Sequence, residues 1–319
     1  MCYSAQVEES FQRYVKQFGA EIDIHEFVKL YAGRAKGSSV RISKAMDANF
    51  ASPRTADEKA IAEMIEVFDR NELSRLEQEL FKQRKRLADA ERKLKIRLTK
   101  AASESQRIAT NKVKWLLSRL ADIKRDELLP RDSRIFPGHY APVMVIEKGR
   151  RIVKPMRYQC RPHGKPAFYD RKYPGTYNAR RDNLEGFWKG QFGHSHGIMI
   201  VNAFYENVSL HDLEGRELGE GEKEENVILE FRPTPQQDML VACLWSHWHS
   251  TSEEDLLSFA AITDEPPAEV AAAGHDRCII PIQSKNVDAW LNPDPKHLDA
   301  LYAILDDRER PYYEHRKAA

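Results

Sequence analysis

The sequence lacks the features that mark several common classes of protein. Its 319 residues include only four cysteines, Cys2, Cys160, Cys243 and Cys278, and no two of them form a CxxC pair. This spacing argues against a zinc ribbon or a small disulfide scaffold, and it favours a reducing cytoplasm. No apolar run of about 18 residues occurs, and no basic leader precedes an apolar segment, so we expect neither a membrane span nor a secretory signal.

An excess of charge of one sign is also missing. The chain carries 50 Lys and Arg against 49 Asp and Glu, which gives a formal net charge of +1. Nucleic-acid binding would therefore have to use a local patch. The hydrophobic content of 41% is enough, at this length, to bury a core. We expect one domain over residues 1–319, with an insertion described next.

Residues 55–128 contain no glycine or proline and are rich in Glu, Lys, Arg, Leu and Ala, so they predict helix. Leucine recurs every seven residues from Leu73 to Leu94, but the second seam position passes through Gln83 and Arg97, which is too polar for a long zipper. We predict an inserted helical hairpin with its turn near residues 101–105. An oligomerising coil is the alternative, and these helices are where a protein partner or a second copy would bind.

From residue 130 onward the sequence consists of short apolar runs separated by turn residues. The predicted strands are 141–149, 151–160, 196–208, 226–233, 239–248, 256–263 and 275–282. No alternation of strand and helix is visible, so the fold class is predicted as α+β with a mainly antiparallel, β-rich core. Helices are expected at 11–19 and at 297–310.

Three polar residues stand where predicted strands begin or end: Asn178, Glu206 and His275. Each alone is typical of an Asx turn, a solvated acid or a structural histidine. Their occurrence together with Cys2 suggests chemistry. Cysteine is small enough for aminopeptidases to remove the preceding Met1, and the mature chain would then begin with a free α-amine and a thiol on adjacent carbons.

Several short motifs recur in a defined order. They are Met1-Cys2, Asn-Ala-Arg at 178–180, AFYEN at 203–207, Leu-Trp-x-x-Trp at 244–248, SFAAIT at 258–263, HDRCIIPI at 275–282 and WLNP at 290–293. In this order they resemble the SOS response-associated peptidase (SRAP) family, whose members sense abasic sites in single-stranded DNA. The resemblance covers roughly residues 1–16 and 135–295, and it leaves out the predicted hairpin.

The resemblance implies a SRAP-like fold and single-stranded DNA containing abasic sites as the partner, with no cofactor. It implies catalytic roles for four residues, Cys2, Asn178, Glu206 and His275. It also implies DNA contacts for three residues, Arg180, Arg277 and Tyr158, with Tyr158 stacking on a base or sugar. Because Arg180 and Arg277 each lie two residues from a catalytic neighbour, a strand would place them on the same face as that neighbour.

The expected chemistry starts from the aldehyde of an open abasic sugar. A terminal amine with a pKa of about 7.7 to 8.0 is substantially neutral at physiological pH and can form an imine, which the adjacent thiol closes to a thiazolidine. The resemblance implies that Glu206 relays protons, with a pKa raised by partial burial. It implies that His275 protonates the ring oxygen or reverses the closure, and that Asn178 holds the amine or the sugar oxygen.

Other interpretations remain open. The histidines at 194–196 and 247–249 could suggest a metal, but no carboxylate or cysteine stands at a ligand spacing in the sequence, so we expect none. The basic run at 82–93 is read as a solvated helix face, with DNA or a partner as the alternative. An N-terminal-nucleophile cysteine peptidase or amidohydrolase would also use Cys2. Departures from the family pattern at Tyr3, Ser4 and Gln159 leave a hairpin scaffold with a degenerate SRAP domain as a third reading.

Overall fold

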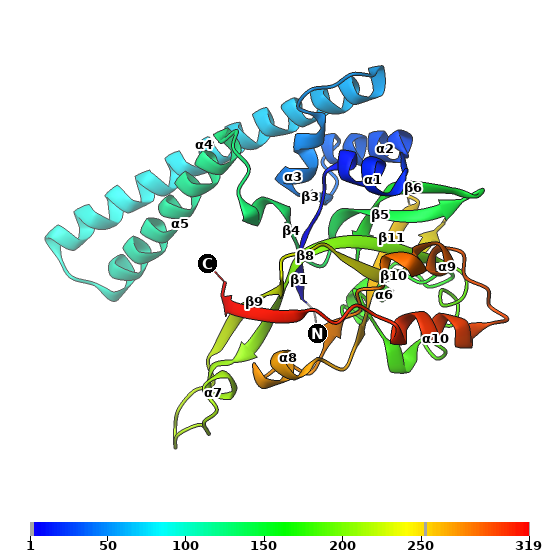
Figure 1. The fold of residues 1–319 in the computed structure, drawn as a ribbon. Helices are drawn as coiled ribbons and strands as arrows, with labels where there is room; N and C mark the ends of the chain where they lie inside the picture. Colours follow the sequence, from blue (N-terminus) through cyan, green and yellow to red (C-terminus); the bar gives the residue numbers. More distant parts are fainter. Residues whose placement is uncertain (1–2, 252–253, 319) are drawn as a thin grey trace. The chain divides into compact units, whose positions relative to one another are not determined.

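The computed structural model describes residues 3–251 and 254–318 (Figure 1). The strands of these residues form one sheet. Its main path runs β13 (Tyr312–Lys317), β9 (Asn226–Thr234), β8 (His196–Ser209), β10 (Met239–Trp248), β11 (Leu256–Asp264), β6 (Arg150–Tyr158), β5 (His139–Glu147) and β3 (Arg41–Ile42). Off this path lie β1 (Ser4–Val7), β2 (Glu21–Ile22), β4 (Arg134–Ile135), β7 (Asn178–Arg180) and β12 (Cys278–Ile279).

Most neighbouring strands in this sheet are antiparallel. Strand β8 pairs antiparallel with β1, β9 and β10, and β10 pairs antiparallel with β11. The exceptions are parallel pairings of β11 with β6 and β7, of β2 with β6 and of β3 with β5. The α+β class with a mainly antiparallel sheet, predicted from the sequence, is confirmed.

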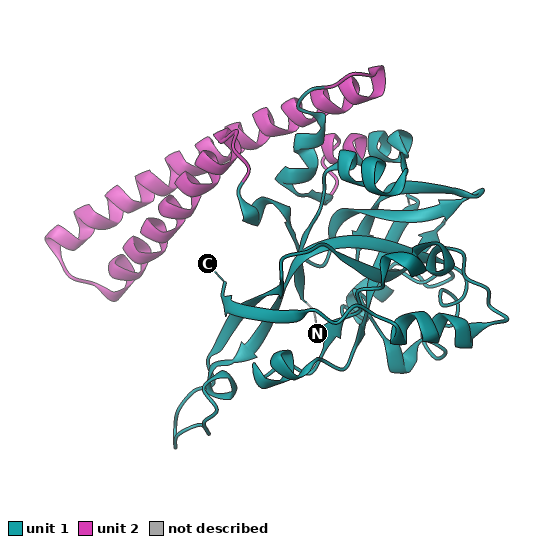
Figure 2. Ribbon diagram, in the orientation of Figure 1, with its two compact units in different colours: residues 1–30, 39–52, 129–319 teal, residues 31–38, 53–128 magenta. Residues whose placement is uncertain are grey.

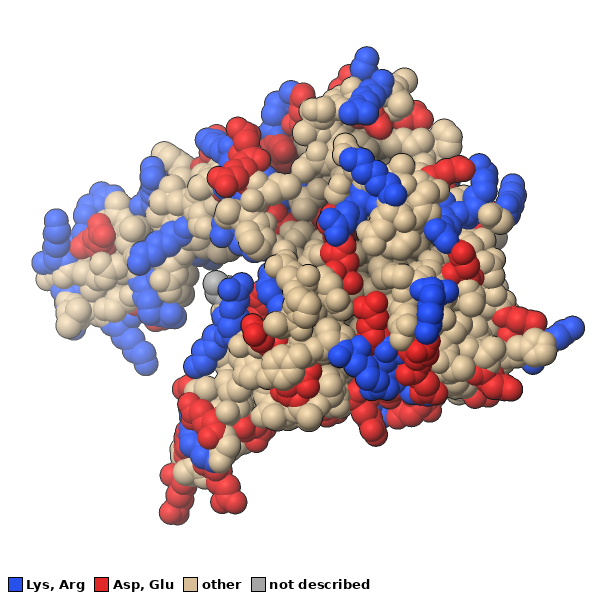
Figure 3. All heavy atoms as spheres, in the orientation of Figure 1, with Lys and Arg blue, Asp and Glu red and all other residues tan. Residues whose placement is uncertain are grey.

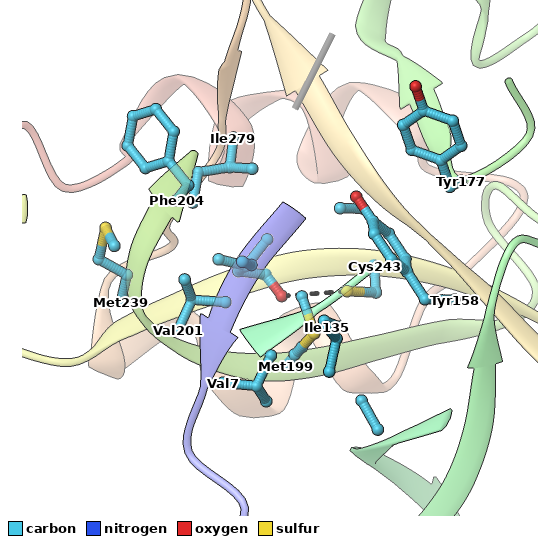
Figure 4. Close-up of a cluster of buried hydrophobic side chains, with 14 of the residues drawn as sticks. Val7, Ile135, Tyr158, Tyr177, Met199, Val201, Phe204, Met239, Cys243 and Ile279 are labelled. Carbon is cyan, nitrogen blue, oxygen red and sulfur yellow. Dashed lines mark hydrogen bonds between the residues drawn. The ribbon is translucent and has the colours of Figure 1, made fainter. Parts of the chain in front are cut away.

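The central strands are buried on both faces, which explains their continuous apolar runs. Alternate residues of β10 enter two different hydrophobic clusters: Val241 and Cys243 lie in one, and Ala242 and Leu244 lie in the other. Figure 4 shows the first cluster, to which β1, β6, β8 and β12 also contribute. The sheet therefore has a core on each side, and its middle strands are held rigidly between them.

Short helices surround the sheet. They are α1 (Phe11–Phe18), α2 (Ile24–Ala35), α3 (Lys44–Asp47), α6 (Tyr169–Lys172), α7 (Leu210–Leu213), α8 (Ala268–Ala272), α9 (Val287–Leu291) and α10 (Leu298–Asp306). Tyr14 of α1, Trp290 of α9 and Leu301 of α10 all pack into the second cluster. These side chains cover the sheet face that the first cluster does not.

Two long helices form the predicted hairpin: α4 (Ala56–Ile96) and α5 (Lys100–Lys124). A reciprocal pair of hydrogen bonds between Thr55 and Glu58 caps the start of α4. The buried seam consists of Leu76, Leu80, Leu116 and Leu120. The turn lies at residues 97–99 rather than near 101–105, because Thr99 caps α5 and residues 101–105 already form its first turns.

The chain divides into two compact units, drawn in different colours in Figure 2. One comprises the described residues of 1–30, 39–52 and 129–319, which include the sheet. The other comprises residues 31–38 and 53–128, which include the hairpin. Arg34 lies over the rings of Tyr31 and Phe68 within this second unit, so α2 contributes its last turns to the base of the hairpin.

Most predicted elements are confirmed, and one is shorter than expected. The helices at 11–19 and 297–310 correspond to α1 and α10, and six of the seven predicted strands correspond to β5, β6, β8, β9, β10 and β11. The predicted strand at 275–282 contracts to β12, because the residues before it form a turn. Among the described residues, no helix is long and apolar enough to cross a membrane.

Candidate active site

A buried acid and a buried histidine meet beside strand β8. The carboxylate of Glu206 is fully buried on β8, and its Oε2 lies 3.1 Å from Nε2 of His275. His275 follows α8 in a tight turn and is itself only 9% exposed. Burial lowers the pKa of His275 below its ordinary value, because a charged imidazole loses its hydration there.

The tautomer of His275 decides which member of its contact with Glu206 can donate a proton. The Nδ1 atom of His275 faces the backbone of Arg277, with the carbonyl oxygen at 3.0 Å and the amide nitrogen at 3.3 Å. If Nδ1 donates to the carbonyl, Nε2 of the neutral ring carries no proton and can only accept a hydrogen bond from a protonated Glu206. If Nδ1 accepts from the amide, Nε2 donates to the carboxylate. Both tautomers leave a pair that can pass a single proton.

Asn178 lies at the start of β7, where the strand runs parallel to β11. Ala261 is its partner in the register, and the Asn178 side chain is 6% exposed. The hydroxyl of Tyr158 donates to Oδ1 of Asn178 at 3.4 Å, so the amide nitrogen of Asn178 faces the opposite way. The residue is positioned by the sheet rather than by the Asx turn that it would suggest in isolation.

The stacking role expected for Tyr158 does not fit its position. The ring is 1% exposed and stacks on Phe259 at 5.2 Å, with Tyr177 packed edge-on at 5.6 Å. Figure 4 draws Tyr158 and Tyr177 at one side of the first hydrophobic cluster. A ring inside the core cannot present a face to a base, and Tyr158 contacts Asn178 through its hydroxyl instead.

A cavity of about 370 Å³ opens beside Asn178. Cationic and aromatic side chains line it, namely Lys172, Arg180, Tyr173, Phe187 and Trp188. Such a mixture suits a phosphate and a flat base or sugar. Reasoning from the sequence missed all of these except Arg180, although the run YDRKYPGTY directly before Asn178 combines aromatic and basic residues.

Arg180 and Arg277 lie in one electrostatic neighbourhood. Arg180 is exposed and donates from Nε to Asp182 at 3.0 Å. This hydrogen bond lowers the pKa of Asp182. Thr263 of β11 pairs with Arg180 on one side and with Ile279 of β12 on the other, so the His275 turn ahead of β12 lies near the end of β7. The expectation that Arg277 shares a strand face with His275 was wrong, because residues 274–277 form a turn ahead of β12.

The first described residues run between the two halves of this site. The ring of Tyr3 lies 6.4 Å from that of Tyr177, the neighbour of Asn178 in the chain. Ser4 pairs with Tyr205, the neighbour of Glu206. Cys2 itself lies outside the described residues.

Arg134 is a further residue that the sequence did not reveal. Its guanidinium donates to the Ser4 hydroxyl from Nε at 3.0 Å and lies 3.7 Å from the ring centre of Tyr205. Burial lowers the pKa of Arg134. The side chain therefore fixes the start of β1 against β8, and no local motif around residue 134 signals this because both partners are far away in the sequence.

The remaining cysteines do not belong to the site chemistry. Cys160, Cys243 and Cys278 are buried free thiols, as expected for core residues. Burial raises the pKa of Cys160 to about 12 and raises the pKa of the other two above their ordinary value. A thiol that resists ionisation is a poor nucleophile.

One group of described residues could hold a metal ion. His247 lies near the end of β10, His249 directly follows the last residue of that strand, and Asp255 directly precedes β11. Nδ1 of His249 lies 2.8 Å from Oδ2 of Asp255, and Nε2 of His247 lies 3.8 Å from it. The sequence argument against a metal considered only the spacing around the histidines, and it missed the carboxylate of Asp255, the residue directly before β11. All three residues are exposed, and none belongs to the Glu206 and His275 contact.

Comparison with known families assigns the chain. The model of the SOS response associated peptidase (SRAP) family matches residues 95–317. This match covers more than half of the sequence, and the chain belongs to this family. It contains the residues from Asn178 to His275 discussed above, and it does not include residues 1–94. Membership supports a peptidase-like function associated with DNA damage and the SOS response.

Solved structures resemble the chain weakly. A protein from Bordetella bronchiseptica is 15% identical with a TM-score of 0.46, over 61% of this chain and 90% of its own. A protein from Bacteroides thetaiotaomicron is 12% identical with a TM-score of 0.44, over 58% and 77%. A phage-related protein from Bordetella bronchiseptica is 16% identical with a TM-score of 0.42, over 58% and 80%. No curated protein sequence matches the chain.

Proposed function

We propose that the protein captures abasic sites in single-stranded DNA through a covalent crosslink to Cys2, formed after removal of Met1, and so shields the lesion. The observation that carries this proposal is the buried contact between Glu206 and His275. Tyr205, the residue before Glu206, pairs with Ser4 of β1. Cys2 is separated from Ser4 by one residue. Membership of a family associated with the SOS response supports damaged DNA as the setting.

The proposed reaction joins an aldehyde and an aminothiol with loss of one water. The neutral α-amine of Cys2 adds to C1′ of the open sugar, and the resulting carbinolamine expels its hydroxyl as water to give an imine. The thiol then adds to the imine carbon through sulfur, and its proton moves to the nitrogen. The five-membered thiazolidine resists hydrolysis better than the imine. An internal cysteine cannot do this, because its nitrogen belongs to a peptide bond.

Glu206 and His275 are suited to the two proton transfers in this sequence. The departing hydroxyl needs a proton, and the nitrogen must lose one after it has added to the carbonyl carbon. Glu206 and His275, in contact with each other, are suited to give and take these protons. The burial of this pair keeps competing water away. Asn178, with its carbonyl oxygen engaged by Tyr158, offers its amide N–H groups to the sugar oxygen without adding charge.

DNA recognition is proposed to use the cavity beside Asn178. Arg180 and Lys172 can meet phosphates next to the lesion, and Tyr173 and Phe187 can contact a neighbouring sugar or base. Arg277 is 15% exposed and lies near the same end of β7, so it can add to this positive field.

The test is to incubate the purified protein with a single-stranded oligonucleotide that contains one abasic site, then separate the products on a denaturing gel and measure intact mass. The expected product lacks Met1 and has the summed mass of protein and DNA minus one water. Cys2→Ala and Cys2→Ser are expected to give none. Borohydride reduction of the abasic site removes the aldehyde and serves as the substrate control. A protein proven to start at Cys2 that gives no adduct would exclude the proposal.

Glu206→Gln tests the proton relay. We expect the crosslinking rate to fall by about 10²- to 10⁴-fold, the usual range for loss of a general acid or base, with little change in noncovalent DNA binding. Glu230→Gln is the matched control, because Glu230 is another buried carboxylate, one strand away, that contacts Arg232 and Arg316 instead of His275. Equal losses in both variants would assign the effect to folding.

A peptidase or amidohydrolase with Cys2 as nucleophile is the second candidate, favoured by the family's description as a peptidase. It would need Glu206 and His275 but neither of the arginines. Charge reversal by Arg180→Glu and Arg277→Glu therefore separates the two activities, since crosslinking should fall and amide hydrolysis should not. The scaffold reading is tested by deleting residues 55–128, and retained crosslinking would count against it.

A further inference from the structure

Positive charge is concentrated in one half of the hairpin, the half that contains the turn. Residues 81–114, here called the turn half, contain 12 Lys or Arg and three Asp or Glu, a net charge of +9. The rest of the chain has 38 and 46, a net charge of −8. The overall value of +1 therefore hides a strong separation of charge. Figure 3 shows blue side chains gathered on the hairpin where the two helices meet the turn.

These cations form a row along one side of α4. Lys82, Lys85, Arg86 and Lys93 are exposed and follow helical spacing. The row extends over about 16 Å at the rise of an α-helix, which is long enough to meet several phosphates of one DNA strand. Asp89 is the one carboxylate within this row, and it forms an ion pair with Arg92.

A groove runs between this row and α5. It has a volume of about 680 Å³, and its other wall includes three small residues, Ala101, Ala102 and Ser105. Arg86 spans the groove by donating to the Ser105 hydroxyl at 3.0 Å. Within the described residues, Lys85 and Lys93 take part in no ion pair, so their charges are available to a ligand. Small residues opposite long cations leave room for an anionic chain.

Two exposed aromatic side chains flank the turn half. Phe81 is 72% exposed at its first position, and Trp115 is 56% exposed directly after its last. Large exposed aromatic rings beside rows of Lys and Arg are typical of surfaces that bind single-stranded nucleic acid, because bases stack on the rings while the cations meet the backbone. Successive phosphates of one strand match a row of cations along one helix better than the scattered carboxylates of an acidic protein do.

We propose that the turn half of the hairpin is a second DNA-binding site, which holds the phosphate backbone of undamaged single-stranded DNA through Lys82, Lys85, Arg86 and Lys93. The site does not require Cys2, an abasic lesion or any part of the crosslinking reaction. It would raise the local concentration of the strand that the protein surveys.

The test uses the full chain with Cys2→Ala, so that crosslinking cannot contribute. Binding to a 20-nucleotide thymidine oligomer is measured by fluorescence anisotropy between 50 and 200 mM NaCl. The site variant changes Lys82, Lys85, Arg86 and Lys93 to Gln. We expect its Kd to rise at least about tenfold, and the slope of log K against log salt to become shallower by about 3, as four lost phosphate contacts predict.

A matched control keeps the charge change constant. It changes Lys59, Arg70, Arg119 and Lys124 to Gln, four exposed cations of the hairpin outside the turn half. Its Kd should stay within about threefold of the parent. Equal losses in both variants, or no loss in the site variant while circular dichroism shows an intact hairpin, would overturn the proposal. Polyglutamate that competes as well as the oligomer does would also overturn it, in favour of an acidic protein partner.

Discussion

The hairpin and the sheet are stabilised over different distances along the chain. In the hairpin, the capping box joins residues three apart, ion pairs such as Arg75 with Glu72 join adjacent turns, and four leucines form the seam. In the sheet, β1 pairs with β8 and β6 pairs with β11, partners that lie about a hundred residues or more apart in the sequence. Local sequence therefore specifies the hairpin, whereas the sheet and the site on it depend on contacts that no short segment contains.

The largest expected difference concerns buried side chains. Phe259→Ala should lower the free energy of unfolding of the sheet by about 3 to 5 kcal/mol, because the ring is fully buried and stacks on Tyr158 between two strands that cannot collapse onto the cavity. Leu116→Ala should cost about 2 kcal/mol, at the low end for leucine, since a two-helix seam can close around the gap.

Urea denaturation followed by far-ultraviolet circular dichroism, together with tryptophan fluorescence, measures both losses. Trp290 and Trp188 report on the sheet, while Trp115 reports on the hairpin. If Leu116→Ala shifted the sheet transition as far as Phe259→Ala does, the two regions would not be stabilised separately, and the comparison would fail.

The same contrast decides what could be predicted of the fold. Residues 55–128 were assigned as a hairpin from composition and heptad spacing, and the error of a few residues in the turn arose because Thr99 is a cap that periodicity does not reveal. The positions of six long strands were also predictable, because apolar runs and turn residues mark them, whereas β13 and five short strands, β1, β2, β3, β4 and β7, were not predicted. The parallel pairing of β7 with β11 was not, since it joins Asn178 to a strand more than 80 residues later.

The site was predictable only in its residue types. Motifs identified Asn178, Glu206 and His275, and the contact between the last two follows from the fold. The burial of Tyr158 was missed because an aromatic residue at a strand end reads equally well as core or as surface. Arg134 was missed because its partners, Ser4 and Tyr205, are distant in sequence. Cys2 remains a prediction from sequence, outside the described residues.

A pH titration separates the regions by their histidines. Residues 55–128 contain none, whereas the sheet unit holds a half-buried His139, with a pKa lowered to about 4, and a buried His196, with a pKa lowered to about 3. Desolvation is the main cause in both. In the unfolded chain these rings take up protons near pH 6.5, so the unfolded state binds more protons than the folded state between about pH 6.5 and 4.

The sheet should therefore lose stability as the pH falls through that range, by up to roughly 1.4 kcal/mol per pH unit for each histidine. The hairpin should not, because it contains no histidine that could take up a proton in this range, and the hydrogen bond from Arg75 lowers the pKa of Glu72. Urea midpoints at pH 7, 6 and 5 measure the slope. His196→Gln should flatten it, and His163→Gln, at an exposed position, should leave it unchanged. A hairpin transition that moved in parallel with the sheet would contradict the assignment.

The smallest expected effect lies within the hairpin, at the caps of its two helices. The Thr55 hydroxyl accepts from the amide of Glu58 at 3.2 Å, and the Glu58 carboxylate accepts from the amide of Thr55 at 3.1 Å. Thr99 makes only the first kind of bond, to the amide of Ala102 at 3.2 Å. Thr55→Ala removes one member of a reciprocal pair, so it should lower the free energy of unfolding of the hairpin by about 1 kcal/mol.

Thr99→Ala should lower the free energy of unfolding of the hairpin by less than Thr55→Ala does, because the Thr99 cap has no reciprocal hydrogen bond. Neither variant should move the unfolding transition of the sheet. Hydrogen exchange of the first-turn amides of α4 and α5 measures the two losses separately. A loss at Thr99 equal to that at Thr55 would mean that the reciprocal bond from Glu58 adds nothing. A shift in the exchange of β8 or β11 amides would mean that a local contact in the hairpin also stabilises the sheet. This would contradict the conclusion that the sheet depends on contacts between residues distant in sequence.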